Sequence, residues 1–229
     1  MANKARGGEL TKKVSSSAEL TPNANQKIVQ YLNDALAMEN AAEARIQSRV
    51  QETIVDATRI QLQDHLEETR SQKDRLKQII RSHGGKPTDA KADLPILKPN
   101  TIDLVRDDVT SSSSSTTKST QNPASQALRG NPSVKSIVKE TDDIRLAAER
   151  ELIQTERDAI IENTEIVKYK MLMEIAKKVG ALDAMPVIDQ NLKEEEQMAN
   201  WIIANMPSML RQLWAQIEIS AGARTAIET

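Results

Sequence analysis

Residues 28–50, IVQYLNDALAMENAAEARIQSRV, decide the fold. Apolar side chains recur in this stretch at steps of three and four residues, a spacing that places them on one face of an α-helix. The positions of this stripe are Ile28, Leu32, Ala35, Leu36, Glu39, Ala42, Ile46 and Val50. Glu39 falls within roughly 30° of the line through its apolar neighbours, at about 100° per residue. A carboxylate that faces a core is costly unless it is paired, protonated or bound to metal, so Glu39 marks a candidate site.

Similar stripes predict further helices along the chain. We expect helices over residues 23–50, 53–84, 138–179, 184–205 and 208–221. Thr53 is a plausible N-cap, and the pair Gly84–Gly85 and the single Gly180 are typical helix stops. Pro207 predicts the end of the helix over 184–205, so that a separate C-terminal helix follows it.

The composition favours an all-α protein and excludes several kinds of site. The 229 residues include no Cys and no Phe, and only 2% are aromatic. Without Cys there is no disulfide, zinc-thiolate site or iron–sulfur cluster. The formal net charge of -2 gives no reason to expect a nucleic acid or an anionic membrane as partner. Because no run of about 18 apolar residues occurs, we expect no membrane span and a cytoplasmic protein.

The helices divide the chain into five segments. They are a flexible tail (1–22), a helix pair (23–85), a linker rich in Ser, Thr and Pro (86–135), a second pair (136–206) and a C-terminal helix with its tail (207–229). The tail contains four basic residues, Lys4, Arg6, Lys12 and Lys13. They make a nucleic-acid-binding arm an alternative, although a solvated tail is the favoured interpretation. The linker is expected to be mobile, and its first half carries possible anchors to the bundle: Ile96, Ile102, Leu104 and Val105.

Acidic residues recur at inward positions on all four main helices. Glu165 and Glu195 lie near the centres of their stripes, and Glu162 lies near the same line as Glu165. On 53–84, His65 and Glu68 are three residues apart and therefore neighbours on one helix surface. Imidazole and carboxylate ligands suit iron or manganese. Inward acids on four helices, with a long connection between the second and third, are the scheme of a ferritin-like di-metal four-helix bundle.

Several motifs resemble the YciE/YciF family of ferritin-like proteins. They are LNDALAME (residues 32–39), HLEET (65–69) followed by Arg75-Leu76, ENTEI (162–166) followed by Tyr169, and LKEEE (192–196). The resemblance covers about residues 25–85 and 140–206. It implies a ferritin-like fold, a link to stress conditions and, by analogy, ferroxidase-like activity. The resulting candidate metal ligands are Glu39, His65, Glu68, Glu162, Glu165 and Glu195.

Two features keep a structural alternative open. Standard di-iron bundles carry Glu-x-x-His on two helices, but Met198 stands three residues after Glu195, and Arg70 stands three after Glu67. An inward Arg70 would supply the positive charge that a metal otherwise provides. The alternative is a metal-free, dimeric helical scaffold, and in either case we expect a homodimer or small homo-oligomer. Tyr169, one turn from Glu165, is a candidate for orienting a ligand or donating an electron, with core packing as the simpler role.

Overall fold

The computed structural model describes residues 22–94 and 132–228, and over these residues the chain is all-α, as predicted. The helices are α1 (Pro22–Glu52), α2 (Asp56–Ser82), α5 (Pro132–Val179), the short 3-10 helix η1 (Leu182–Ala184) and α6 (Met185–Glu228). α1 contacts α2 and α5, and α6 contacts the same two helices, so the four long helices form a bundle. The predicted basic tail, the linker anchors and the Ser-rich run lie outside the described residues.

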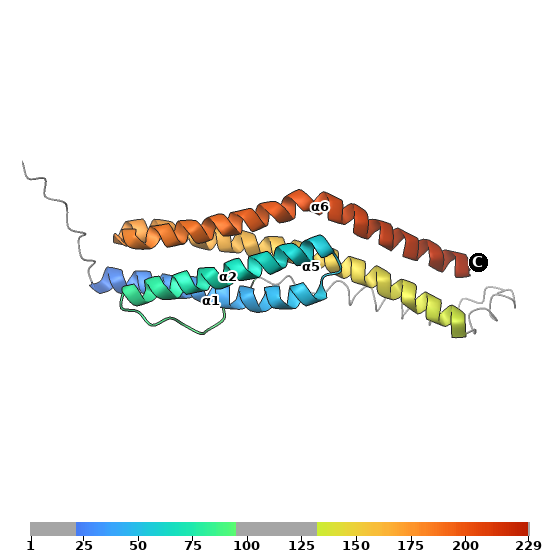
Figure 1. The fold of residues 1–229 in the computed structure, drawn as a ribbon, viewed down its shortest axis with the longest axis horizontal. Helices are drawn as coiled ribbons and strands as arrows, with labels where there is room; N and C mark the ends of the chain where they lie inside the picture. Colours follow the sequence, from blue (N-terminus) through green and yellow to red (C-terminus); the bar gives the residue numbers. More distant parts are fainter. Residues whose placement is uncertain (1–21, 95–131, 229) are drawn as a thin grey trace, which may run out of the picture.

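The direction of the helices sets the length of the connection between the two pairs. α2 ends at one end of the bundle, and α5 begins beyond the opposite end (Figure 1). A short loop cannot join these two points, since a 27-residue helix such as α2 is roughly 40 Å long. The long segment between α2 and α5 is therefore required by the topology.

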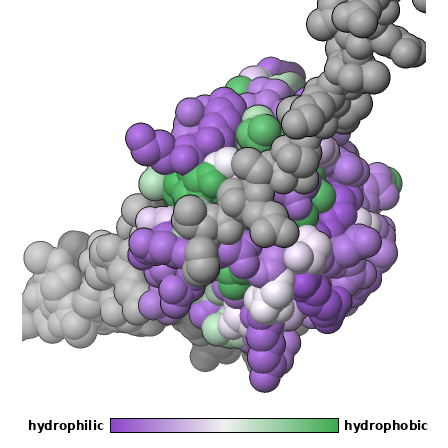
Figure 2. All heavy atoms as spheres, turned by 90° about the vertical axis from the view of Figure 1, so that its left-hand side faces the viewer, coloured by the Kyte–Doolittle hydropathy of each residue, from purple (hydrophilic) through white to green (hydrophobic). Residues whose placement is uncertain are grey.

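Glycines follow the ends of α2 and α5. Gly84 and Gly180 have φ of +73° and +82°, a backbone conformation that glycine adopts without strain, and both predicted stops are confirmed. Gly85 is needed for close packing, because an added Cβ would lie 2.5 Å from Cγ1 of Val29. Figure 2 looks onto this end of the molecule, where the surface is mainly hydrophilic with smaller hydrophobic areas between.

Three predicted helix boundaries were wrong. α2 begins at Asp56 and not at Thr53, because the Thr53 hydroxyl accepts a hydrogen bond from the Val55 amide and stays in the turn. α5 begins at Pro132, inside the predicted linker, and proline is well suited to the first position of a helix. α6 runs through Pro207 without ending, so the separate C-terminal helix does not exist.

Packing explains why α6 continues past Pro207. Proline removes one backbone hydrogen bond and typically bends a helix, and α6 bends near its middle (Figure 1). Beyond the proline, Met209 and Leu213 are buried against Val55 and Ala148. This apolar contact favours the helical continuation over a stop.

The first residues after α2 run back along α1. The Asn40 side chain donates hydrogen bonds to the carbonyls of Thr88 and Ala90. The Asn33 side chain accepts a hydrogen bond from the Thr88 amide and donates one to the Lys86 carbonyl. The Ala92 amide also donates to the Ala37 carbonyl at 2.8 Å. Residues 86–94 are thus held on the surface of α1; we call this segment the strap.

Within the described residues, no helix is both long and apolar enough to cross a membrane. This agrees with the absence of a long apolar run in the sequence.

Candidate metal centre

Five ionisable side chains from all four long helices are buried together in the bundle. Each is at most 4% exposed: Glu39 on α1, His65 on α2, Glu162 and Glu165 on α5, and Glu195 on α6. We call this group the carboxylate cluster. Each helix contributes to the centre because its acid or imidazole stands on the buried face that packs against the other helices.

His65, Glu162 and Glu195 form the tightest part of the carboxylate cluster. Nε2 of His65 lies 3.3 Å from Oε2 of Glu162 and 3.6 Å from Oε2 of Glu195. One ligand atom from each of the three residues falls within 4.8 Å of the others, close enough to hold a metal ion. A nitrogen and two carboxylates match the preferences of iron, manganese or zinc.

Glu68 contacts the other ring nitrogen of His65. Its Oε2 is 3.1 Å from Nδ1, and the side chain is 38% exposed at the edge of α2. A carboxylate on Nδ1 fixes the orientation of the ring and leaves Nε2 to face a metal, as metal-binding histidines usually require. The structure therefore places Glu68 behind His65 and not beside the three ligand atoms.

Two buried amides and a tyrosine orient the carboxylates. The Tyr169 hydroxyl donates to Oε1 of Glu39 and accepts a hydrogen bond from Asn191 at 2.9 Å. Oδ1 of Asn191 in turn accepts from Nε of Arg75 at 2.8 Å. On the other side, Gln72 donates to Oε1 of Glu195 at 2.5 Å. Tyr169 also belongs to the apolar core, so it both packs and positions Glu39.

Several carboxylate oxygens in the carboxylate cluster make no hydrogen bond to the described residues. They are Oε2 of Glu39, Oε2 of Glu162, Oε1 of Glu165 and Oε2 of Glu195. Two of them, Oε2 of Glu162 and Oε2 of Glu195, lie 3.3 and 3.6 Å from Nε2 of His65. Buried polar atoms are normally satisfied, so four such oxygens in one place are unusual. Four carboxylates face a single imidazole, and a divalent cation would supply both the missing charge and the missing partners. The residues present therefore fit a metal ion.

The burial also changes the protonation of these groups. Burial raises the pKa of Glu39 from 4.5 to about 7, although the Tyr169 hydrogen bond opposes the change. Burial, together with the charges of neighbouring glutamates, raises the pKa of Glu165 and of Glu195 well above its usual value. Burial disfavours the charged form of His65, but the neighbouring carboxylates of Glu162, Glu68 and Glu165 together outweigh this and raise the His65 pKa well above 6.5. Without a metal, the carboxylate cluster would hold extra protons.

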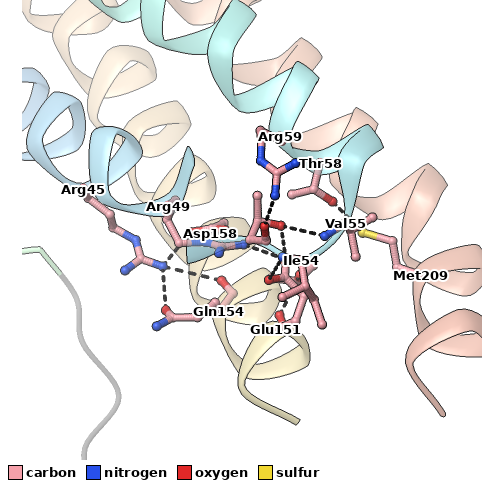
Figure 3. A network of polar contacts seen from close by, with 12 residues as sticks. Arg45, Arg49, Ile54, Val55, Thr58, Arg59, Glu151, Gln154, Asp158 and Met209 are labelled. Atoms are coloured by element: carbon pink, nitrogen blue, oxygen red, sulfur yellow. Dashed lines mark hydrogen bonds and ion pairs between the residues drawn. The ribbon is translucent and has the colours of Figure 1, made fainter. Parts of the chain in front are cut away.

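A second buried polar group lies where α1 turns into α2 (Figure 3). Nε of Arg49 bonds Asp158 at 2.7 Å, and its Nη2 bonds Glu151 at 3.0 Å. Arg45 bonds the other oxygen of Asp158 at 2.5 Å. We call Arg45, Arg49, Glu151 and Asp158 the arginine cluster. It ties α5 to the turn, because Glu151 also accepts hydrogen bonds from the Thr53 hydroxyl and the Ile54 amide.

Arg70 does not enter the carboxylate cluster. It is exposed and pairs with Glu43 and Glu67 on the surface. One of the two features that favoured the structural alternative, an inward Arg70, is therefore wrong, while the missing second Glu-x-x-His motif remains. Met198 is buried in an apolar group with Ile46 and Leu62, and so serves packing.

Sequence reasoning missed some of the residues around the site. Asn191 stands four residues before Glu195, the spacing of helix neighbours, so its inward position was detectable. Arg49 lies between Ile46 and Val50 at the edge of the α1 stripe, and Asp158 stands seven residues before Glu165, which places both acids on the same face of α5. An arginine and an aspartate both facing inward could have indicated the arginine cluster.

Comparison with solved structures supports the fold. A protein from Xanthomonas campestris pv. campestris aligns with a TM-score of 0.54 and 16% identity, over 86% of this chain and 99% of that one. YcfI from Rhodopseudomonas palustris aligns with a TM-score of 0.52 and 17% identity, over 82% of this chain and 97% of that one. At such low identity these similarities show the fold alone.

The sequence matches a family across most of its length. The match covers residues 23–95 and 124–215, and the family is described as a domain of unknown function, DUF892. These ranges contain every member of the carboxylate cluster and of the arginine cluster. The chain belongs to the DUF892 family, the YciE/YciF-like ferritin-like proteins.

Proposed function

We propose that this protein binds iron or manganese in the carboxylate cluster. The supporting observation is the set of four buried carboxylate oxygens that make no hydrogen bond to the described residues and share a single imidazole. His65, Glu162 and Glu195 are the first ligands in this proposal, since their ligand atoms are already close together. Glu39 and Glu165 are the adjacent carboxylates that can complete the coordination or hold a second ion.

The surrounding residues prepare these ligands. Glu68 holds Nδ1 of His65, so that the imidazole presents Nε2 to the interior. Tyr169 holds Glu39, and Gln72 holds Glu195. Apolar groups containing Leu36 on one side and Leu62 on the other flank this part of the bundle. The ligands are thus positioned before any ion binds.

The activity that follows from this proposal is redox chemistry under stress. Iron or manganese would supply one-electron chemistry toward oxygen or peroxide, which corresponds to a ferroxidase or peroxide-detoxifying protein. The chain contributes the oriented ligands, flanking apolar groups and groups that exchange protons. Because His65 and the glutamates must lose their protons to bind a metal, binding should release protons to solvent.

Elemental analysis of the protein purified without chelator tests this proposal. We expect at least one iron or manganese ion per chain, and loss of the metal in a His65→Ala/Glu195→Gln variant. Glu67→Gln is the matched control, since Glu67 is an exposed acid on the same helix as His65. Absence of metal from the native protein, even after anaerobic Fe(II) reconstitution, would contradict the proposal.

A specific observation favours a second candidate, a dimeric scaffold. The first part of α5 and the last part of α6 extend beyond α1 and α2 as a two-helix layer (Figure 1). This extension exposes large apolar side chains: Ile137, Ile144, Leu210, Trp214 and Ile219. A second copy of the chain could cover them and complete a four-helix arrangement there.

The mass of the protein in solution tests the scaffold. We expect a dimer by light scattering, and a shift to monomer in Leu210→Glu/Trp214→Glu. Gln212→Glu is the control, since it adds a charge at an exposed position on the same part of α6. A monomeric wild-type protein would exclude this candidate.

A further inference from the structure

A small cavity connects the surface to one member of the carboxylate cluster. It has a volume of about 180 Å³ and lies between α1, the strap and α5. Asp34, Asp93 and Thr164 line it and are exposed to solvent, whereas Glu165 lines it and is only 1% exposed. Glu165 is therefore its inner end, and the exposed residues mark its opening.

The buried end of the cavity offers an unused ligand. Oε1 of Glu165 is buried and has no hydrogen-bond partner among the described residues. Glu165 lies three residues after Glu162, so the two carboxylates are neighbours on α5. A cation that reaches Glu165 is consequently one helix turn from the group formed by His65, Glu162 and Glu195.

The charge of the lining suits a divalent cation. Three carboxylates line the cavity against one amine, Lys168. Two of these acids, Asp34 and Asp93, are at the exposed end, where they can attract a hydrated cation from solution. Met38 and Ile161 supply apolar wall between the opening and the interior.

The strap gives the cavity a fixed outer wall. Ala92, Asp93 and Leu94 belong to the strap and line the cavity. The hydrogen bond from the Ala92 amide to the Ala37 carbonyl holds the strap at this position on α1. The wall is thus built by backbone contacts and does not depend on a flexible side chain.

We propose that this cavity is the access route by which a divalent cation reaches Glu165 and then the rest of the carboxylate cluster. The inference rests on the proposed metal binding and adds where the ion passes. Asp34 and Asp93 attract the hydrated ion, and Glu165 transfers it to Glu162. The route predicts that changes at the cavity alter the rate of metal uptake and leave the final occupancy unchanged.

The test measures uptake of Co(II) by stopped-flow absorption in three variants of the full chain. Ala92→Leu fills the cavity, and Asp34→Asn/Asp93→Asn removes the outer charges without changing volume. Asp64→Asn/Asp74→Asn is the control, because it removes two exposed charges from α2, away from the cavity. Circular dichroism and the thermal midpoint establish that each variant is folded.

We expect uptake to slow about tenfold or more in Asp34→Asn/Asp93→Asn, the range in which electrostatic steering acts. Uptake should also slow in Ala92→Leu, because the larger side chain fills the route. The control should keep the wild-type rate, and all proteins should reach the same final occupancy. Wild-type rates in Ala92→Leu and in Asp34→Asn/Asp93→Asn would overturn the access route while leaving the metal site intact. Failure of the wild-type protein to bind Co(II), Fe(II) or Mn(II) at all would overturn the proposed function and the route together.

Discussion

The carboxylate cluster and the arginine cluster are two buried charged groups that share α1 and α5 but balance their charge differently. In the arginine cluster, two guanidinium groups face two carboxylates. All four oxygens of Glu151 and Asp158 accept a hydrogen bond, whereas Nε of Arg45 and Nη1 of Arg49 have no acceptor among the described residues. In the carboxylate cluster, four glutamates face one imidazole, and four oxygens make no hydrogen bond in the described part of the chain, two of them lying near Nε2 of His65 alone.

This difference separates a structural role from a binding role. Burying a charge is costly in either case, and the arginine cluster offsets that cost with its own side chains. The carboxylate cluster lacks such partners, so it must take up protons or bind a cation. Burial alone would not have distinguished the two groups, whereas charge balance and donor counts do.

The largest expected effect comes from removing the central cation of the arginine cluster. Arg49→Met leaves Glu151 and Asp158 buried without their shared partner. We expect the free energy of unfolding to fall by about 3–5 kcal/mol, the usual result of breaking a buried ion pair. Urea denaturation measures the change.

A compensated variant sharpens this result. Arg49→Met/Glu151→Gln/Asp158→Asn removes both acids along with the guanidinium, and we expect it to recover much of the lost stability. If Arg49→Met alone were as stable as the wild-type protein, the arginine cluster would not act as a structural tie.

The second prediction concerns the dependence of metal-free stability on pH. The pKa of Glu39 is raised from 4.5 to about 7, and those of His65 and Glu165 are also raised. The folded protein therefore binds more protons than the unfolded chain, so stability falls as pH rises. For Glu39 the contribution is complete below pH 4.5 and is lost as pH rises through about 7. Each proton of difference gives a slope of about 1.4 kcal/mol per pH unit.

Urea denaturation between pH 5 and 8 checks this slope, with and without saturating Mn(II). Bound metal should offset the loss, because it stabilises the deprotonated ligands. In Glu39→Gln/Glu165→Gln the part of the slope due to these two carboxyl groups should disappear. A metal-free wild-type protein with the same slope as this variant would show that neither carboxyl group retains its proton on folding.

A smaller effect is expected at the residue behind His65. Glu68→Gln keeps a hydrogen-bonding group next to Nδ1 of His65 but removes the negative charge of the carboxylate. We therefore expect Mn(II) affinity to fall about 10- to 100-fold. Isothermal titration calorimetry measures the affinity. Glu67→Gln should bind as the wild-type protein does, and a fall of equal size there would show that the effect is general surface charge.

The smallest effect is expected within the carboxylate cluster itself. Glu165→Gln removes one uncompensated acid, so the metal-free protein should gain about 1 kcal/mol of stability while it binds metal more weakly. The opposite responses of Arg49→Met and Glu165→Gln would distinguish the two clusters most clearly. If Glu165→Gln destabilised the metal-free protein, its carboxylate would already have an internal partner.

Much of the fold could be predicted from the sequence because the signals are local. The stripe around Ile28 and Leu32, together with Gly84 and Gly180, located helices and their ends. Pro207 misled the prediction, since a proline signal is local, whereas the packing of Leu213 against the first helix pair is not. The position of α6 beyond the proline depends on contacts that periodicity cannot show.

The candidate site was predictable in its members but not in their roles. Inward stripe positions identified Glu39, Glu165 and Glu195, and each is buried. Which nitrogen of His65 faces Glu68, and which carboxylates approach Nε2, depend on side-chain orientation between helices. Sequence spacing also placed Arg70 as a possible inward charge, and only the fold shows that it is on the surface.

Anomalous diffraction from crystals of the protein soaked in Mn(II) tests the central claim most directly. We predict a manganese peak in the carboxylate cluster, coordinated by Nε2 of His65 and by carboxylate oxygens of Glu162 and Glu195. No peak should occur in the arginine cluster, where the carboxylates already form ion pairs with guanidinium groups. Absence of a peak at His65, with its imidazole still paired to Glu162, would contradict the account and leave the buried acids as protonated members of a structural core.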